Sequence, residues 1–146
     1  MRFGLFTSMG GQTWERVLDF WQHSERTGWD IACVTDHFMP NSPTKEGDMP
    51  EGWSMLAALA ASVPRMRVGT IVLGNTYRHP AVVAKMAAQV DIISNGRLLL
   101  GIGAGWQENE HDAYGIPFYT MGERLRRLDE ACAVMRSLWS EDRSDF

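Results

Sequence analysis

The chain has 146 residues, 45% of them hydrophobic, and a net charge of −4, a composition that indicates one globular domain of ordinary size. It contains no run of like charge and no basic patch interleaved with aromatic residues, so we expect no nucleic-acid partner. No apolar stretch has the length of a membrane span or of a signal-peptide core. The two cysteines, Cys33 and Cys132, lie in apolar segments and predict no disulfide framework. We therefore expect a cytoplasmic protein with no membrane partner.

The first half of the chain predicts two strands, the first followed by a helix and the second by a long loop. Residues 3–7 form a short apolar run closed by Ser-Met-Gly-Gly, which is typical of a strand and its turn. The next segment ends near Gly28 and has apolar residues at i, i+3, i+4 and i+7, as an amphipathic helix does. Residues 31–35 are an unbroken apolar run, typical of a strand covered on both faces. Residues 39–52 carry three prolines and no periodicity, so we expect a lid or substrate loop. The apolar stripe of the helix consists of Trp14, Val17, Leu18 and Trp21.

The second half continues the alternation of strands and helices. Residues 53–63 are rich in Ala and Leu and predict a helix. Residues 68–73 and 98–102 are apolar runs that predict strands, and residues 81–93 predict the helix between them. A final long helix begins with a capping box and carries one apolar face. The box is Thr120 and Glu123, and the face is Leu125, Leu128, Cys132, Met135 and Trp139.

Four strands, each followed by a helix, predict an α/β fold with parallel strands and right-handed crossovers, written (βα)4. Two architectures accept this pattern: an open doubly wound sheet, or half of an eight-stranded TIM-type barrel. The turn at residues 8–12 lacks the G-x-G-x-x-G of a dinucleotide site, which disfavours the doubly wound sheet. Residues 101–105 resemble that fingerprint only loosely.

Polar residues follow the second and third predicted strands, at the edge of a parallel sheet where ligands bind. Asp36 and His37 come directly after the second strand, where an aspartate can accept hydrogen bonds and a histidine can move a proton. The alternative is that Asp36 caps a turn and His37 packs beneath it. After the third strand, Gly74 allows close approach of a ligand, while Asn75 and Thr76 offer hydrogen-bonding groups. The alternative for these three residues is a plain turn.

The segment after the fourth strand contains Trp106, Asn109, Glu110 and His111. Divalent metal sites need three or more ligands, and no His-x-His or His-x-x-x-His spacing occurs, so we expect no metal. For Glu110 we expect a structural or anion-pairing role, and for His79 a structural role in its loop.

Several motifs together resemble the luciferase-like monooxygenase superfamily, and most of all its branch that uses the deazaflavin coenzyme F-420. The resemblance covers the whole chain. It depends on residues 35–38 (TDHF), 74–81 (GNTYRHPA), 91–97 (DIISNGR) and 101–106 (GIGAGW), and continues through Glu110, residues 114–117 (YGIP) and residues 138–139 (LW).

This resemblance implies an eight-stranded barrel that binds the flat ring of the coenzyme at the carboxyl ends of its strands. Asp36 and His37 would face the coenzyme, with His37 as the proton donor or acceptor in hydride transfer. Similar enzymes carry a non-proline cis peptide in the third strand, which corresponds to Ile71 and Val72 and supports the ring from behind. By the same correspondence Gly74, Asn75 and Asn109 take coenzyme-contacting positions.

The resemblance also implies a length of about twice this chain, so that residues 1–146 form the N-terminal half of one domain. Phosphate-binding elements of this fold come from its late loops. Where relatives that oxidise a sugar phosphate have a glutamate, this chain has Trp106, which argues against that substrate. The expected activity is hydride transfer between F-420 and a small organic substrate, by a homodimer. Two alternatives stay open: an FMN-dependent monooxygenase, and a catalytically silent truncated fragment.

Overall fold

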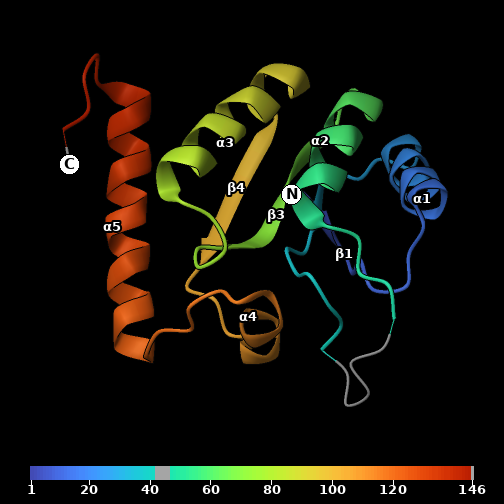
Figure 1. The fold of residues 1–146 in the computed structure, drawn as a ribbon. Helices are drawn as coiled ribbons and strands as arrows, with labels where there is room; N and C mark the ends of the chain where they lie inside the picture. The colour runs from blue at the N-terminus through green and yellow to red at the C-terminus, as the bar shows by residue number, and fades with distance from the viewer. Residues whose placement is uncertain (42–46, 146) are drawn as a thin grey trace.

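The computed structural model describes residues 1–41 and 47–145, which form a four-stranded parallel sheet and five helices (Figure 1). The strand order β1-β2-β3-β4 follows the order along the chain. The predicted strands and the helices at 53–63 and 81–93 are confirmed, with their ends displaced by at most one residue. The elements are β1 (Gly4–Thr7), α1 (Trp14–Arg26), β2 (Ile31–Val34), α2 (Gly52–Ser62), β3 (Arg67–Gly74), α3 (Pro80–Ser94), β4 (Leu98–Gly103), α4 (Glu108–Tyr114) and α5 (Met121–Ser140).

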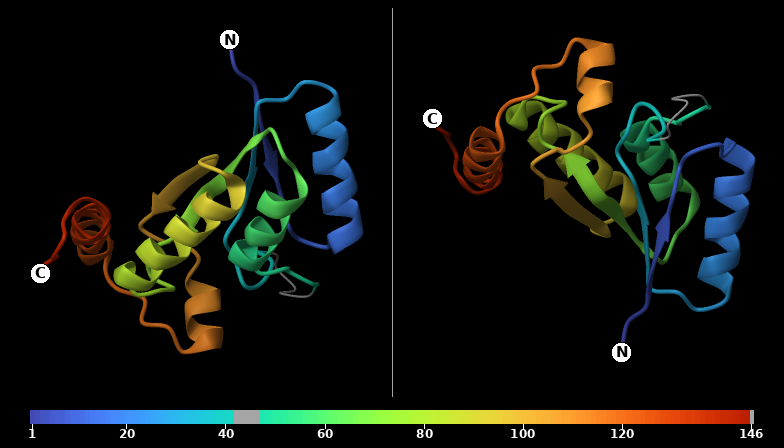
Figure 2. Two further views of the ribbon diagram at one scale, coloured as in Figure 1. Left: turned by 90° about the horizontal axis from the view of Figure 1, so that it is seen from above. Right: turned by 90° about the horizontal axis from the view of Figure 1, so that it is seen from below.

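The helices and the sheet form two layers, with α1, α2 and α3 packed along one face of the sheet and α5 beside α3 (Figures 1 and 2). Side chains such as Trp21, Leu56 and Val68 are fully buried between these layers. The opposite face carries Phe6 and Ile71, which are 56% and 53% exposed. A doubly wound sheet has helices on both faces, so the arrangement of the described elements favours the barrel architecture.

Each of the long helices begins with a local capping interaction. The side chain of Thr13 caps α1, that of Glu51 caps α2, and Thr120 forms a capping box at the start of α5, as predicted. At α3 the cap is the imidazole of His79, which accepts from a backbone N–H, and Pro80 follows at the first helical position. The expected structural role of His79 is therefore confirmed.

The short helix α4 was not predicted, because its seven residues have no apolar stripe to reveal it. It lies at the carboxyl end of β4, between β4 and α5 (Figure 1). Two weak signals mark it in the sequence: acidic residues in its first turn, and Gly115 directly after it. Gly115 ends the helix in the left-handed conformation, with φ of +64°.

The apolar face predicted for α5 is only partly buried. Met135 is buried, whereas Leu125 and Trp139 are 55% and 49% exposed. The reason is that α5 packs against α3, and no other described element covers the rest of the stripe. Trp139 nevertheless anchors the helix, since its indole N–H donates to the carbonyl of Ala84 at 3.0 Å. Neither α5 nor any other helix within residues 1–41 and 47–145 is both long and apolar enough to cross a membrane.

The loop predicted over residues 39–52 connects β2 to α2, and residues 42–46 lie outside the described part. Its first described residues contact the residue that precedes α4, because the Gln107 side chain donates to the carbonyl of Met39 at 3.1 Å. Its last part is tied to the turn after β1, where the N–H of Gly11 donates to the carbonyl of Asp48 at 2.9 Å. A lid or substrate role for this loop stays a prediction.

Candidate functional site

The carboxyl ends of the strands surround a cavity of about 360 Å³, called here the strand-end cavity. Five residues predicted from the sequence as a site line it together: Asp36, His37, Ile71, Val72 and Gly74. The peptide bond between Ile71 and Val72 is cis, at the position that the family resemblance indicates, and the β3–β4 register shifts there. The other lining residues are Phe6, Thr35, Tyr77, Gly105 and Trp106.

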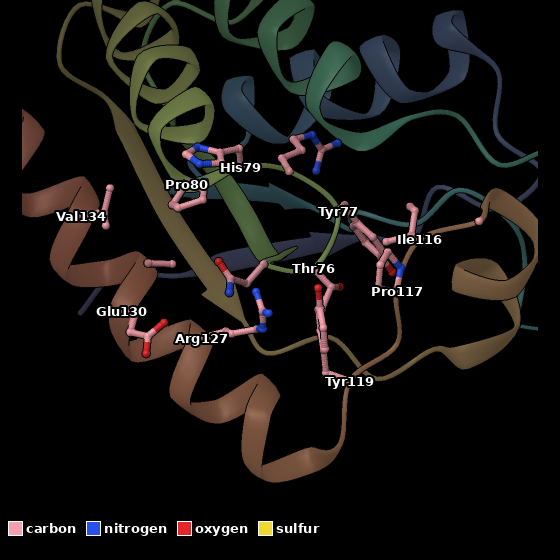
Figure 3. A pocket seen from close by; sticks show the side chains of 14 residues that line it. Thr76, Tyr77, His79, Pro80, Ile116, Pro117, Tyr119, Arg127, Glu130 and Val134 are labelled. Atoms are coloured by element: carbon pink, nitrogen blue, oxygen red, sulfur yellow. The ribbon is translucent and has the colours of Figure 1, made fainter. Parts of the chain in front are cut away.

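The other three predicted residues lie elsewhere. Asn75 and Thr76 line a second cavity of about 550 Å³, outside the sheet between the start of α3, residues 115–119 and α5 (Figure 3). The Thr76 hydroxyl is within 2.7 Å of Nε2 of His111. Asn109 is half-buried on α4 and lines neither cavity. Tyr77 lies between the two cavities and lines both.

Asp36 is fixed by a buried ion pair. Its two carboxylate oxygens accept from the guanidinium of Arg78 at 2.7 and 2.9 Å, and one of them also accepts from the N–H of Gly74 at 3.0 Å. Arg78 in turn donates to Glu51, the residue that caps α2. Burial alone would lower the pKa of Arg78, but Asp36 and Glu51 outweigh it and raise that pKa above its ordinary value. The network thus joins the ends of β2 and β3 to the start of α2 by a permanently charged group.

Glu110 forms a second buried cluster, on α4. Its carboxylate lies 2.8 Å from Nδ1 of His37, accepts from the N–H of Phe38 at 2.9 Å, and accepts from the hydroxyl of Tyr77. The side chain is fully buried. Burial by itself would raise the pKa of Glu110, but these hydrogen bonds outweigh burial and hold the pKa below its ordinary value. For Glu110 we expected a structural or anion-pairing role, and its carboxylate contacts the backbone of Phe38, the hydroxyl of Tyr77 and the candidate catalytic histidine.

The ring of Tyr77 fits against Glu110 only because residue 74 is glycine. A Cβ added to Gly74 would lie 2.3 Å from the Tyr77 ring. Gly74 thus permits the approach of a side chain of this protein, whereas the sequence suggested the approach of a ligand. Burial and the hydrogen bond to Glu110 raise the pKa of Tyr77 far above its ordinary value, so its hydroxyl stays protonated and donates.

His37 lines the strand-end cavity and keeps some contact with solvent, 18% of its side chain being exposed. Its ring meets the edge of Trp106, with 5.6 Å between the ring centroids. Because Glu110 occupies its Nδ1, the second ring nitrogen is the atom with which His37 can give or take a proton. The geometry is that of an acid–base group beside an apolar wall.

Sequence reasoning did not predict the hydrogen bonds that three members of these clusters make: Glu51, Tyr77 and Arg78. Each makes its contact with a residue 27 to 42 positions away. The sequence contains two signals for these contacts. Tyr77 and Arg78 follow directly after Gly74-Asn75-Thr76, and the guanidinium of an arginine commonly pairs with a carboxylate such as that of Asp36.

The fold and this edge define a class of protein: an α/β domain of parallel strands with a candidate active site at their carboxyl ends. A family model described as luciferase-like monooxygenase matches residues 1–146. The chain belongs to the luciferase-like monooxygenase family, as its motifs predicted.

Curated relatives include F-420-dependent glucose-6-phosphate dehydrogenases. The enzyme of Nocardia farcinica (strain IFM 10152) is 40% identical over 132 residues, which are 89% of this chain and 39% of that enzyme. The enzyme of Kineococcus radiotolerans is 38% identical over 132 residues, 90% of this chain and 39% of that enzyme. The chain therefore spans about two fifths of the length of the curated relatives it matches.

Solved structures of the same fold include an F-420-dependent secondary alcohol dehydrogenase in complex with an F-420–acetone adduct. It superposes on this chain with a TM-score of 0.87 at 25% identity. The superposed part is 99% of this chain and 45% of the dehydrogenase chain. The monooxygenase RslO1 from Streptomyces bottropensis superposes with a TM-score of 0.83 at 26% identity. The superposed part is 100% of this chain and 45% of the RslO1 chain. These enzymes are TIM-type barrels, so the four-stranded sheet corresponds to about half of an eight-stranded barrel, which confirms the predicted fold.

Proposed function

We propose that this chain forms the N-terminal half of an F-420-dependent oxidoreductase that moves a hydride between the coenzyme and a small organic substrate. The observation that carries the proposal is the strand-end cavity, in which an acid–base histidine lies beside an apolar surface. Relatives up to 40% identical that are named as F-420-dependent dehydrogenases support the choice of coenzyme.

The residues present fit a flat tricyclic ring. Ile71 and Val72 are apolar, 53% and 45% exposed, and no described element covers them, so they offer a surface on which a ring can rest. Trp106, 58% exposed, forms a second apolar wall. Ile71 and Val72 would hold the ring from behind, and His37 would lie beside its reacting edge. Asp36 would act from behind the cavity, because both of its oxygens are bonded to Arg78.

When bound, coenzyme F-420 supplies the chemistry of hydride acceptance and return. The contribution of this chain is the proton: oxidation of a hydroxyl group releases one, and reduction of a carbonyl group takes one up. His37 is placed to move that proton, and the ionised Glu110 on its other nitrogen would stabilise the imidazolium that results. The apolar walls would exclude water from the reacting atoms.

An FMN-dependent monooxygenase is the second candidate, and the likeness to the monooxygenase RslO1 at 26% identity supports the monooxygenase reaction. Fluorescence titration of the protein with F-420, and separately with FMN, distinguishes the two candidates. We expect saturable binding of F-420 and none of FMN. The reverse result would replace the deazaflavin proposal with the flavin one, and binding of neither would leave a catalytically silent chain.

A paired substitution tests the role of His37. In the full-length enzyme we expect His37→Ala to lower turnover by about 100-fold or more, the usual contribution of a general acid or base, while coenzyme binding largely survives. The matched control is His23→Ala, because His23 is an exposed histidine on α1. Unchanged turnover in His37→Ala would remove this residue from the mechanism.

We further propose that the protein is a cytoplasmic homodimer. Val82, Ile92 and Ile93 on α3 are 44% to 71% exposed, an apolar surface of the kind that subunit contacts cover. Cys33 and Cys132 are both free, which suits a reducing compartment. Light scattering coupled to size-exclusion chromatography should give the molar mass of a dimer for the wild-type protein. For the Ile92→Glu variant it should give the molar mass of a monomer.

A further inference from the structure

The hydrogen bonds around Glu110 restrict where its neighbours can carry protons. Two of its three partners donate to it: the backbone N–H of Phe38, which can only donate, and the hydroxyl of Tyr77. The carboxylate therefore acts as an acceptor toward both, and the low pKa of Glu110 agrees with this assignment. An ionised carboxylate has no hydrogen to donate. The contact of 2.8 Å with Nδ1 of His37 must then be a hydrogen bond that the imidazole donates.

A neutral imidazole carries one hydrogen, so a hydrogen on Nδ1 leaves Nε2 with a free lone pair. Nδ1 faces the buried carboxylate, and Nε2 has no hydrogen-bond partner within residues 1–41 and 47–145. His37 also lines the strand-end cavity. The buried side of the ring is thus tied to the protein, and the other side is available to a ligand.

Among the described residues, the other charged side chains near His37 form ion pairs with one another and not with its imidazole. Asp36, on the adjacent position of the chain, is paired with Arg78, and Arg78 is paired with Glu51. Tyr77 stays uncharged because of its raised pKa. Glu110 on α4 is therefore the charge that acts directly on the imidazole.

From this geometry we propose that Glu110 is the positioning residue of the site: it holds neutral His37 in the Nδ1–H tautomer, so that Nε2 accepts the hydroxyl proton of the substrate. This inference rests on the proposed function for its substrate, an alcohol. The alcohol carbon loses a hydride to the coenzyme, its O–H bond breaks, and the proton forms a bond to Nε2, leaving a carbonyl compound. In the reverse direction the imidazolium returns the proton to the oxygen.

The tautomer can be measured without coenzyme, by ¹⁵N NMR of the histidine side chains in the intact protein above the titration of His37. The proposal expects a pyrrole-like shift at Nδ1 of His37 and a pyridine-like shift at Nε2. The opposite assignment would overturn it.

Two variants should move the titration midpoint of His37 in opposite directions. Glu110→Gln removes the opposite charge, so the midpoint should fall by about one pH unit or more, and the tautomer preference should weaken. Tyr77→Phe keeps the ring but removes a competing donor, so the carboxylate should hold the imidazolium more tightly and the midpoint should rise. The control is Glu108→Gln, an exposed carboxylate on the same helix, which should leave both unchanged. If one of the two variants folds poorly, the other one decides. An unchanged titration midpoint of His37 in each variant that folds would overturn the proposal.

The NMR result separates this inference from the proposed function. If the tautomer and both midpoint changes are as expected but F-420 does not bind, the positioning role of Glu110 stands and the proposed coenzyme falls. If F-420 binds but His37 carries its hydrogen on Nε2, the proposed coenzyme stands and the positioning role of Glu110 falls. In the enzyme with F-420 bound, the acidic limb of the pH profile of kcat/KM should move with the NMR midpoint in each variant.

Discussion

Asp36 and Glu110 are both buried carboxylates at the carboxyl ends of the strands, yet their partners give them different capacities. Asp36 pairs with a guanidinium, which is charged at every pH that the protein meets. Glu110 pairs with an imidazole, a group that can give or take a proton at its other ring nitrogen. The first pair can therefore only hold elements together, whereas the second can take part in proton transfer. The chemistry of a buried carboxylate in this protein is decided by the partner.

The largest effect should follow from breaking the pair that holds the elements together. Asp36→Ala leaves the Arg78 guanidinium, 14% exposed, without its main partner, and should lower the free energy of unfolding by about 3 to 5 kcal/mol. Urea denaturation measures it. Asp36→Asn keeps the shape and should recover part of the loss. A loss below about 1 kcal/mol in Asp36→Ala would show that this pair is not what joins β2 to β3.

A smaller loss should follow from disturbing the second cluster through its packing. Gly74→Ala places a methyl group 2.3 Å from the Tyr77 ring, and we expect a loss of about 2 to 3 kcal/mol, since the ring must move. Gly122→Ala on α5 is the matched control, because a Cβ there meets nothing within 4 Å. Adding Tyr77→Ala to Gly74→Ala should cancel most of the effect of the alanine at 74, and additive losses would contradict the contact.

The charge of Glu110 should stabilise the fold only above acidic pH. Because the folded-state pKa of Glu110 lies below its ordinary value of 4.5, the carboxylate contributes stability above that pH, and the contribution is lost as the pH falls through the folded-state pKa. Glu110→Gln should therefore be less stable than wild type by about 1 to 2 kcal/mol at pH 7. The difference should shrink below pH 4.5. Urea titrations at several pH values measure it, and a difference that stays constant with pH would contradict the ionised pair.

The smallest change in the free energy of unfolding should come from an exposed ion pair. Arg126 and Glu130 on α5 lie 3.8 Å apart, and both side chains are 65% exposed. Arg126→Ala should change the free energy of unfolding by less than about 0.5 kcal/mol, because water and salt screen the interaction. A change as large as that of Gly74→Ala would mean that burial does not control these energies.

Much of the fold could be predicted from the sequence, because apolar runs and helical stripes report local structure. The residues of β2 and β3 illustrate this, and their ends agree to within one residue. The burial of the α5 stripe could not be predicted, because it depends on what packs against the helix. Leu125 repeats with the stripe but lies on a side that α3 does not reach.

The candidate site could be predicted less completely. Adjacent positions at strand ends correctly brought Asp36 and His37 to one cavity. The same reasoning placed Asn75 with them, but the structure puts it at another cavity, where its backbone N–H donates to the carbonyl of Gly103. Side-chain direction after a bulged strand does not follow strand alternation, so spacing alone could not decide it. The partnership of His37 with Glu110 spans 73 residues and could not be derived from either segment alone.

The order of the strands in the sheet has a consequence for how the chain folds. Since β1, β2, β3 and β4 pair with their neighbours in sequence, each loop closure spans one crossover and no more, as from Gly4 to Ile31 or from Val68 to Leu98. Each strand and its helix can dock on the unit made just before it, so the sheet can grow in the direction of synthesis, from β1 toward β4.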